Sequence, residues 1–192
     1  NFQVVGLNFS KDTDISHILK TLNRHTYYTS GSRGLVLLPK NPTKDIVLFC
    51  DEINLPKLDA YGSQSTILFL RELIEKNGFW KTNENKWVTM ERIHVVGACN
   101  PSTDPGRIFM TQRFTRHVTV LQISYPSIPS LKHIYRVFYD GILQLTPPFK
   151  RYSEGFAEGS IRLYEKCKYN FSGNSQTHYL ISPRELTRWM RG

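Results

Sequence analysis

The chain has 192 residues, of which 40% are hydrophobic and 21% are charged. That composition is typical of a globular protein and excludes wholesale disorder and fibrous structure. A helix that crosses a bilayer needs roughly 20 consecutive apolar residues, whereas the longest dense apolar run, IVLFC at 46–50, has the length of a buried strand. We therefore expect no membrane partner.

The three cysteines lie far apart and show neither a CxxC motif nor zinc spacing. They predict reduced, intracellular thiols and argue against a disulfide scaffold or a zinc module. Residue 1 opens directly into the strand-like FQVVGLNF, so the sequence predicts no signal peptide, and this start indicates an excised fragment.

The net charge is +9, from 25 Lys and Arg against 16 Asp and Glu, with a pI near 9.5. A basic balance favours a polyanionic partner, either a nucleic acid or an acidic protein surface. No block of five or more basic residues is present, so lysines and arginines that keep several faces soluble are the simpler interpretation. We do not expect nucleic acid as the main partner.

Strand and helix patterns alternate over residues 1–125. The clearest buried strand is DIVLFCDEINLP, which ends in two acids. The predicted elements are, in chain order, a strand at 4–9, a helix from Asp12 or Thr13 to about Thr26, a hairpin-like excursion within 27–44, a strand at 45–56, a helix from Ser65 to Asn77 closed by Gly78, the strand KWVTM, a strand at 92–101 and a strand at 116–123.

Helical patterns alone follow after about residue 125. Apolar residues of 131–145 fall on one helical face, and Pro147-Pro148 ends that helix. A second helix covers the region of Phe156 to Phe171. In the segment SPRELTRWMRG, Ser182 is the predicted N-cap of a third helix, and Glu185 stands three residues later at the capping-box spacing. The sequence thus predicts an α/β domain over 1–125 and an all-helical domain over 126–192.

The strongest chemical signal is the acidic pair Asp51 and Glu52 after an apolar strand. A hydrolase of Mg-nucleotides needs one carboxylate to hold the metal, usually through water, and a second to deprotonate the attacking water. Ligands of open α/β sheets also collect at the carboxyl ends of the strands. The alternative is a solvated strand-to-loop turn, where acids are common.

Three further groups fit the same chemistry, each with a simpler alternative. Asn100 follows a predicted strand and offers an amide to a water or a γ-phosphate, or forms an Asx turn before Pro101. Arg113 and Arg116 are spaced to reach a phosphate across a subunit boundary, or are ordinary surface arginines. Arg184 stands at a helix N-terminus that favours anions, although such a sequence is common.

This ordered set resembles the AAA+ ATPases, in which a parallel-sheet core is followed by a small helical lid. The phrases VLFCDEINLPKLDAYGSQ, VGACNPSTDPGR, QRFTRHV and HYLISPRELTRWMRG are similar to the cytoplasmic dynein heavy chains, most of all to the third module of their motor ring. The likeness covers essentially the whole chain. Segments 27–44 and 78–91 stand where dynein modules carry hairpin insertions.

The resemblance implies a role for each candidate residue. It makes ATP and Mg2+ the expected cofactors of the parent chain. One motif of the family is missing: the Walker A loop GxxxxGK[ST] is absent from these 192 residues. We therefore expect the fragment itself to be inactive. The implied roles are Walker B for Asp51 (metal) and Glu52 (base), sensor I for Asn100, sensor II for Arg184, resting-state partner of Glu52 for Asn8, and arginine fingers toward a neighbouring site for Arg113 and Arg116.

The leading hypothesis is a regulatory ATPase module of a cytoplasmic, cytoskeletal motor. Its expected partners are the neighbouring AAA+ modules of the same heavy chain and, through the parent motor, microtubules. A ring protein of the midasin type is the alternative within AAA+. A basic α/β nucleic-acid-binding domain and a purely structural ring module are the alternatives from other classes.

Overall fold

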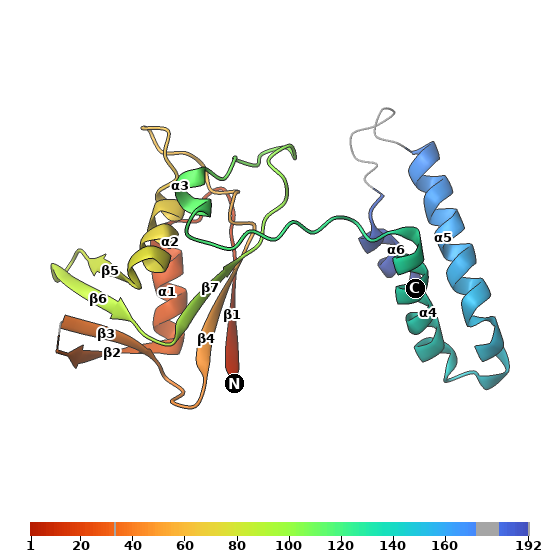
Figure 1. Ribbon diagram of the computed structural model, residues 1–192, viewed down its shortest axis with the longest axis horizontal. Coiled ribbons are helices and arrows are strands. Elements are labelled where there is room, and N and C mark those ends of the chain that lie inside the picture. The colour runs from red at the N-terminus through yellow and green to blue at the C-terminus, as the bar shows by residue number, and fades with distance from the viewer. Residues whose placement is uncertain (33, 172–180, 192) are drawn as a thin grey trace. The chain divides into compact units, whose positions relative to one another are not determined.

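The computed structural model describes residues 1–32, 34–171 and 181–191 (Figure 1). Two compact units follow each other along the chain, Asn1–Leu121 and Gln122–Gly192. The first carries strands and helices, and the described part of the second is helical. This is the expected combination of a parallel-sheet core and a helical part.

A parallel sheet lies on one side of the first unit (Figure 1). Its strand order is β1-β4-β7, so β4 lies in the middle. Along β4, Ile46, Leu48 and Cys50 are fully buried and alternate with more exposed residues, as a strand with one face on the core requires. Burial also raises the pKa of the Cys50 thiol to about 12. The bounds are β1 Phe2–Asn8, β4 Asp45–Asp51 and β7 Ile93–Gly97.

The two predicted hairpin excursions join into one second sheet of order β2-β3-β6-β5. Within it, β2 pairs antiparallel with β3 and β5 with β6, while β3 and β6 are parallel neighbours. The sequence predicted the excursions but not this pairing, which joins residues about fifty positions apart. The bounds are β2 Thr26–Gly31, β3 Gly34–Pro39, β5 Gly78–Lys81 and β6 Lys86–Met90.

Two helices of the first unit, α1 (Ile15–His25) and α2 (Ser65–Lys76), place their apolar faces on the shared core. Asp14, not Asp12 or Thr13, caps α1, because its carboxylate accepts the N–H of His17 at 3.0 Å. Hydrogen bonds from Ser16 and His17 lower the pKa of Asp14 to about 2.

The predicted end of α2 at Gly78 was wrong by one residue. Asn77 takes the left-handed conformation with φ 49°, and Gly78 is already the first residue of β5. A Cβ on Gly78 would collide with the carbonyl oxygen of Val88 and with the ring of Trp87. Glycine is therefore required there for close strand packing, and not for ending the helix.

The predicted strand at 116–123 was also wrong. After the short helix α3 (Gln112–Thr115), the described backbone up to residue 127 forms no strand. Val120, Leu121 and Ile123 are 67%, 79% and 90% exposed. The β propensity of this run is real, but a strand also needs a neighbour to satisfy its backbone groups, and no described strand pairs with it.

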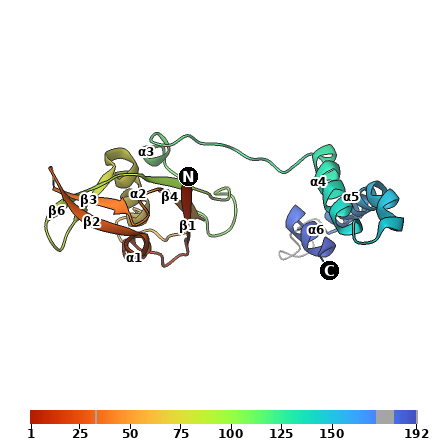
Figure 2. The ribbon, with the colours of Figure 1, turned by 90° about the horizontal axis from the view of Figure 1, so that it is seen from below.

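The second unit packs α4 (Ile128–Leu143), η1 (Pro147–Tyr152), α5 (Ser153–Asn170) and α6 (Pro183–Met190), as Figure 2 shows. Its core includes Tyr135, whose hydroxyl donates to the carbonyl of Pro183 at 2.9 Å and so ties α4 to α6. Ser182 and Glu185 form the predicted capping box of α6. The predicted end of the first helix before Pro147 is confirmed, because α4 stops at Leu143.

Candidate functional site

The carboxyl ends of three parallel strands meet at one edge of the parallel sheet (Figure 1). In the β1–β4 ladder Asn8 stands directly opposite Asp51, and the next N–H, of Phe9, donates to the carbonyl of Asp51 at 2.9 Å. On the other side of β4, Cys50 stands opposite Gly97 in β7. The topology therefore brings Asn8, the acidic pair and the loop that follows β7 to the same edge.

The turn after β4 fixes the backbone of Glu52 in an unusual conformation. Its φ is 61°, in the left-handed region, which costs a non-glycine residue about 1–2 kcal/mol. Hydrogen bonds hold the turn: Asp51 Oδ1 accepts the N–H of Glu52 at 2.9 Å, and the carbonyl of Ala98 accepts the N–H of Ile53 at 3.1 Å. Such local strain is typical of functional positions.

Asn100 comes from the loop after β7, whose strand is the neighbour of β4. Its side chain is exposed, and its backbone carbonyl accepts the amide of Asn54 at 2.8 Å. Asn54 is 1% exposed, and its backbone carbonyl accepts the backbone N–H of Ile108 at 3.0 Å. Asn54 thus ties the loop after β4 to the loop after β7 at two points.

Sequence reasoning missed Asn54, although an amide inside the apolar run INLP was a usable signal. It also missed Arg107, whose Nη1 forms an ion pair with Glu52 Oε2. Both atoms are buried, and the contact is an ion pair without an aligned hydrogen bond. The side chains of Arg107 and Glu52 are 13% and 29% exposed. The phrase DPGR contained this arginine, but nothing in its spacing pointed back to β4.

The charges of this ion pair also act on the pKa of the Cys99 thiol. Partial burial raises the pKa of the Cys99 thiol, the negative charge of Glu52 raises it further, and the positive charge of Arg107 opposes both. The side chain itself is exposed. A reagent that reacts with the Cys99 thiolate can therefore report on the charges around Glu52.

The two candidate finger arginines lie on and after α3, not at the strand ends. Phe114 is buried in the core and anchors this helix, while Arg113 and Arg116 on either side of it are exposed. Arg116 Nε donates to Nε2 of His117 at 3.0 Å. The same His117 nitrogen lies 3.7 Å from Oε2 of Glu75 in α2. Exposure leaves both guanidinium groups accessible to an anion outside this unit.

Arg184 belongs to the second unit. It is the second residue of α6, its side chain is exposed, and its backbone N–H donates to Ser182 Oγ at 3.2 Å. The cap holds the backbone of the helix start and leaves the guanidinium group exposed.

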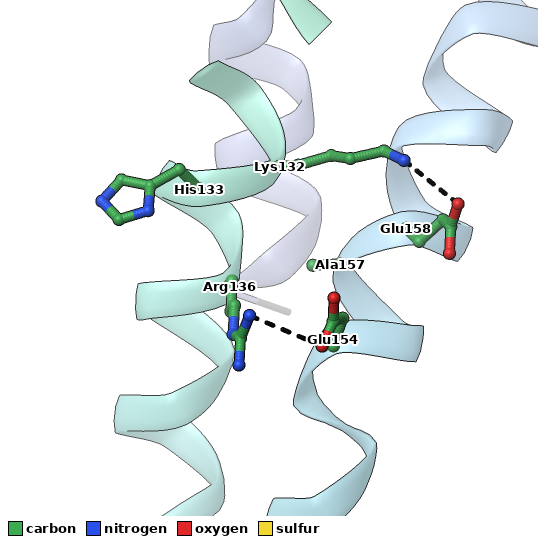
Figure 3. Close-up of a pocket in the computed structure, with 6 residues that line it drawn as sticks. All are labelled: Lys132, His133, Arg136, Glu154, Ala157 and Glu158. Carbon is green, nitrogen blue, oxygen red and sulfur yellow. Dashed lines mark hydrogen bonds and ion pairs between the residues drawn. The ribbon is translucent and has the colours of Figure 1, made fainter. Parts of the chain in front are cut away.

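A pocket of about 240 Å³ lies between α4 and α5, and Figure 3 shows the side chains that line it. Its charges pair across the two helices: Lys132 with Glu158 at 3.1 Å, and Arg136 with Glu154 at 3.5 Å. Lys132 also lowers the pKa of Glu158. These pairs explain the pocket as part of a helix–helix contact, and it carries none of the candidate residues.

A magnesium ion at the strand-end site would have Asp51 as its protein ligand. Mg2+ in nucleotide sites is usually held by one or two carboxylates together with waters and phosphate oxygens, so a single aspartate at a strand end fits. Within residues 1–32, 34–171 and 181–191, no three His, Cys, Asp or Glu side chains gather into an all-protein metal cage. In the same residues no helix is long and apolar enough to cross a membrane.

A parallel sheet with an acidic strand end, followed by a helical unit, is the arrangement expected of a P-loop ATPase core and its lid, and comparison with known families shows this class. Residues 1–126 match the family described as "P-loop containing dynein motor region", and residues 138–192 match "Dynein heavy chain, ATPase lid domain". The chain therefore belongs to the dynein heavy-chain family, which confirms the prediction from the sequence.

Curated relatives support this over the whole chain. It is 62% identical over 191 residues to the cytoplasmic dynein heavy chain of Saccharomyces cerevisiae, 45% over 192 residues to that of Drosophila melanogaster and 42% over 192 residues to that of Dictyostelium discoideum. Each match covers 100% of this chain but only 5%, 4% and 4% of the relative. The chain thus spans about a twentieth of the heavy chains that it matches.

Proposed function

We propose that this chain forms the hydrolytic and sensing part of one ATPase module in a dynein motor ring, and that the module regulates movement along microtubules. The observation that carries the proposal is the β1-β4-β7 edge, where Asn8, Asp51 and Glu52 lie together beside the loop of Asn100. Membership of the dynein family supports the microtubule role, which belongs to the heavy chain as a whole.

Each residue of this edge has a chemical task. Asp51 would hold Mg2+, and Glu52 would take the proton of the attacking water. The amide of Asn100 would orient that water or a terminal phosphate oxygen, and Asn8 would pair with Glu52 in the resting state. ATP, when bound, supplies the terminal phosphoryl group, which is transferred to water with release of ADP and phosphate.

The arginines would connect this module to its surroundings. Arg184, exposed on α6, would sense the terminal phosphate and change the position of the lid. Arg113 and Arg116 would act on the site of the preceding module. The neighbouring modules of the same heavy chain are therefore the direct partners, and we place the whole assembly in the cytoplasm on the cytoskeleton, in keeping with the "cytoplasmic" name of the relatives.

The phosphate-binding loop must come from elsewhere in the heavy chain. No GxxxxGK[ST] occurs in these 192 residues, so neither a lysine nor the backbone amides of a P-loop are available here to hold the phosphates. In this proposal the chain supplies the residues that act on the terminal phosphate, and another segment supplies most of the binding energy.

Glu52→Gln in the full heavy chain tests this function. The amide keeps the shape of the side chain and removes the base, so hydrolysis at this module should slow on the order of 10²–10⁴-fold while ATP stays bound. Retained nucleotide and single-molecule velocity on microtubules are the measurements. Glu84→Gln, in the exposed turn between β5 and β6, is the control. Unchanged velocity and microtubule release would refute the regulatory role.

A further inference from the structure

Arg107 is a largely buried cation to which none of the roles above gives a task. Its guanidinium group reaches from the loop after β7 to the carboxylate of Glu52, which follows β4. Glu52 Oε2, the oxygen on the arginine side, is buried. In this conformation that oxygen is occupied and shielded, and the ion pair fixes the direction in which the carboxylate points.

The backbone around Arg107 is held on both sides. Its own N–H donates to the carbonyl of Asp104 at 3.2 Å, and the N–H of Ile108 donates to the carbonyl of Asn54 at 3.0 Å. Gly106, just before the arginine, has a φ of 76°, which allows the sharp turn. The loop therefore presents Arg107 to Glu52 in a defined way, and the contact is not that of a long side chain sampling the surface.

We propose that Arg107 is a positioning residue that holds Glu52 Oε2 in a resting orientation, alongside the pairing proposed for Asn8, and that Arg107 must withdraw before the carboxylate can turn toward the water whose proton it takes. The inference rests on the proposed function, since Glu52 is a base that needs restraint only if this module hydrolyses ATP. Asn54 couples the loop after β4 to the loop that carries Arg107, because it forms hydrogen bonds with both ends of the Arg107 loop, at Asn100 and Ile108.

A second ion pair on the same two strands provides a matched control. Arg92, just before β7, pairs through Nε with Asp45 Oδ1, at the start of β4, at 2.7 Å. It joins the same strands at their opposite ends and lies away from the acidic turn. An effect of losing Arg107 that Arg92→Met does not reproduce is therefore specific to the Glu52 end.

The first experiment measures hydrolysis in the full heavy chain. The contribution of this module is the ATP hydrolysis rate of a variant minus the rate of the same variant that also carries Glu52→Gln. We expect Arg107→Met to raise that contribution about tenfold, as loss of one restraining ion pair on the base would, and Arg107→Lys, which keeps the charge, to stay near wild type. Arg107→Gln serves as a second variant if the methionine variant does not fold.

The second experiment monitors the Arg107–Glu52 ion pair directly, without measuring hydrolysis. The thiolate of Cys99 is alkylated with iodoacetamide at fixed pH, and the modified peptide is quantified by mass spectrometry. Arg107→Met should slow alkylation, because the opposing cation is lost, and Glu52→Gln should speed it. A non-hydrolysable ATP analogue should slow Cys99 alkylation in the wild type, because Arg107 withdraws, and should have no such effect in Arg107→Met.

The outcomes separate this inference from the proposed function. If Glu52→Gln slows hydrolysis while Arg107→Met leaves both hydrolysis and Cys99 alkylation unchanged, the resting contact is overturned and the proposed function stands. If Arg107→Met slows hydrolysis as much as Glu52→Gln, Arg107 assists the reaction and does not restrain it. If Glu52→Gln itself leaves hydrolysis unchanged, both proposals fail.

Discussion

The side-chain amide of Asn54 donates a hydrogen bond to the backbone carbonyl of Asn100 at 2.8 Å. Asn54 is buried and comes shortly after Asp51 and Glu52. This bond therefore sets the distance between the loop that carries Glu52 and the loop that carries Asn100. The geometry of the candidate site thus depends on a residue to which the proposed chemistry assigns no direct part.

Asn54→Ala should therefore impair both stability and the site. The hydrogen bond is partly buried, so its loss should cost about 1 kcal/mol, and the Asn100 loop should become more mobile. Urea unfolding and hydrogen exchange of residues 98–110 measure the two effects. Asn83→Ala, in the exposed turn between β5 and β6, should change neither. Exchange in the loop that matches wild type would show that Asn54 is not the tie.

The isolated 192-residue chain should bind Mg-ATP weakly, with a Kd above about 1 mM, because its sequence contains no P-loop. Isothermal titration calorimetry measures this. A micromolar Kd would mean that the phosphate site has been assigned to the wrong part of the protein.

Arg184→Ala in the full heavy chain should weaken the response of this module to nucleotide. The proposed role of the arginine is to bind the terminal phosphate, so ATP and ADP states should become harder to distinguish, with up to about a tenfold loss in their affinity ratio. Fluorescent nucleotide titrations measure the ratio. Arg188→Ala, also exposed on α6, is the control and should leave the ratio unchanged. An equal loss in both variants would argue for a general charge effect.

Gly78→Ala should destabilise the first unit by about 1–3 kcal/mol, as overpacking does, because the new methyl group meets the carbonyl of Val88 and the ring of Trp87. Gly6→Ala is the matched control, since a Cβ on Gly6 in β1 meets nothing within 4 Å. Thermal unfolding compares the two. A stable Gly78→Ala protein would mean that the β5–β6 pair shifts at little cost.

Local sequence signals were sufficient for much of the fold and for the acidic pair. Alternating burial in β4 follows from its apolar run, and the capping box of α6 follows from Ser182 and Glu185. The sequence predicted polar residues at the ends of both β4 and β7, and the structure shows that these strands are parallel neighbours. These features depend on contacts between residues close in sequence, or on the general topology of parallel sheets.

Long-range features were not predictable in the same way. The ion pair of Arg107 with Glu52 depends on the path of a loop, which is fixed by a hydrogen bond from Ile108 to Asn54. The pairing of β3 with β6 unites two excursions that each look complete as a hairpin. Conversely, 116–123 has the pattern of a strand without a described partner, and pattern alone cannot supply one.

The alternation along β4 links the chemistry of this edge to correct folding. Because neighbouring side chains point to opposite faces, a shift of one residue would turn Asp51 into the core and expose Leu48 and Cys50. The resulting buried charge would disfavour that state strongly. A folded chain with intact core packing must therefore carry Asp51 at the end of the sheet and not in the core, so one register of β4 determines both the packing of the interior and the position of the acid.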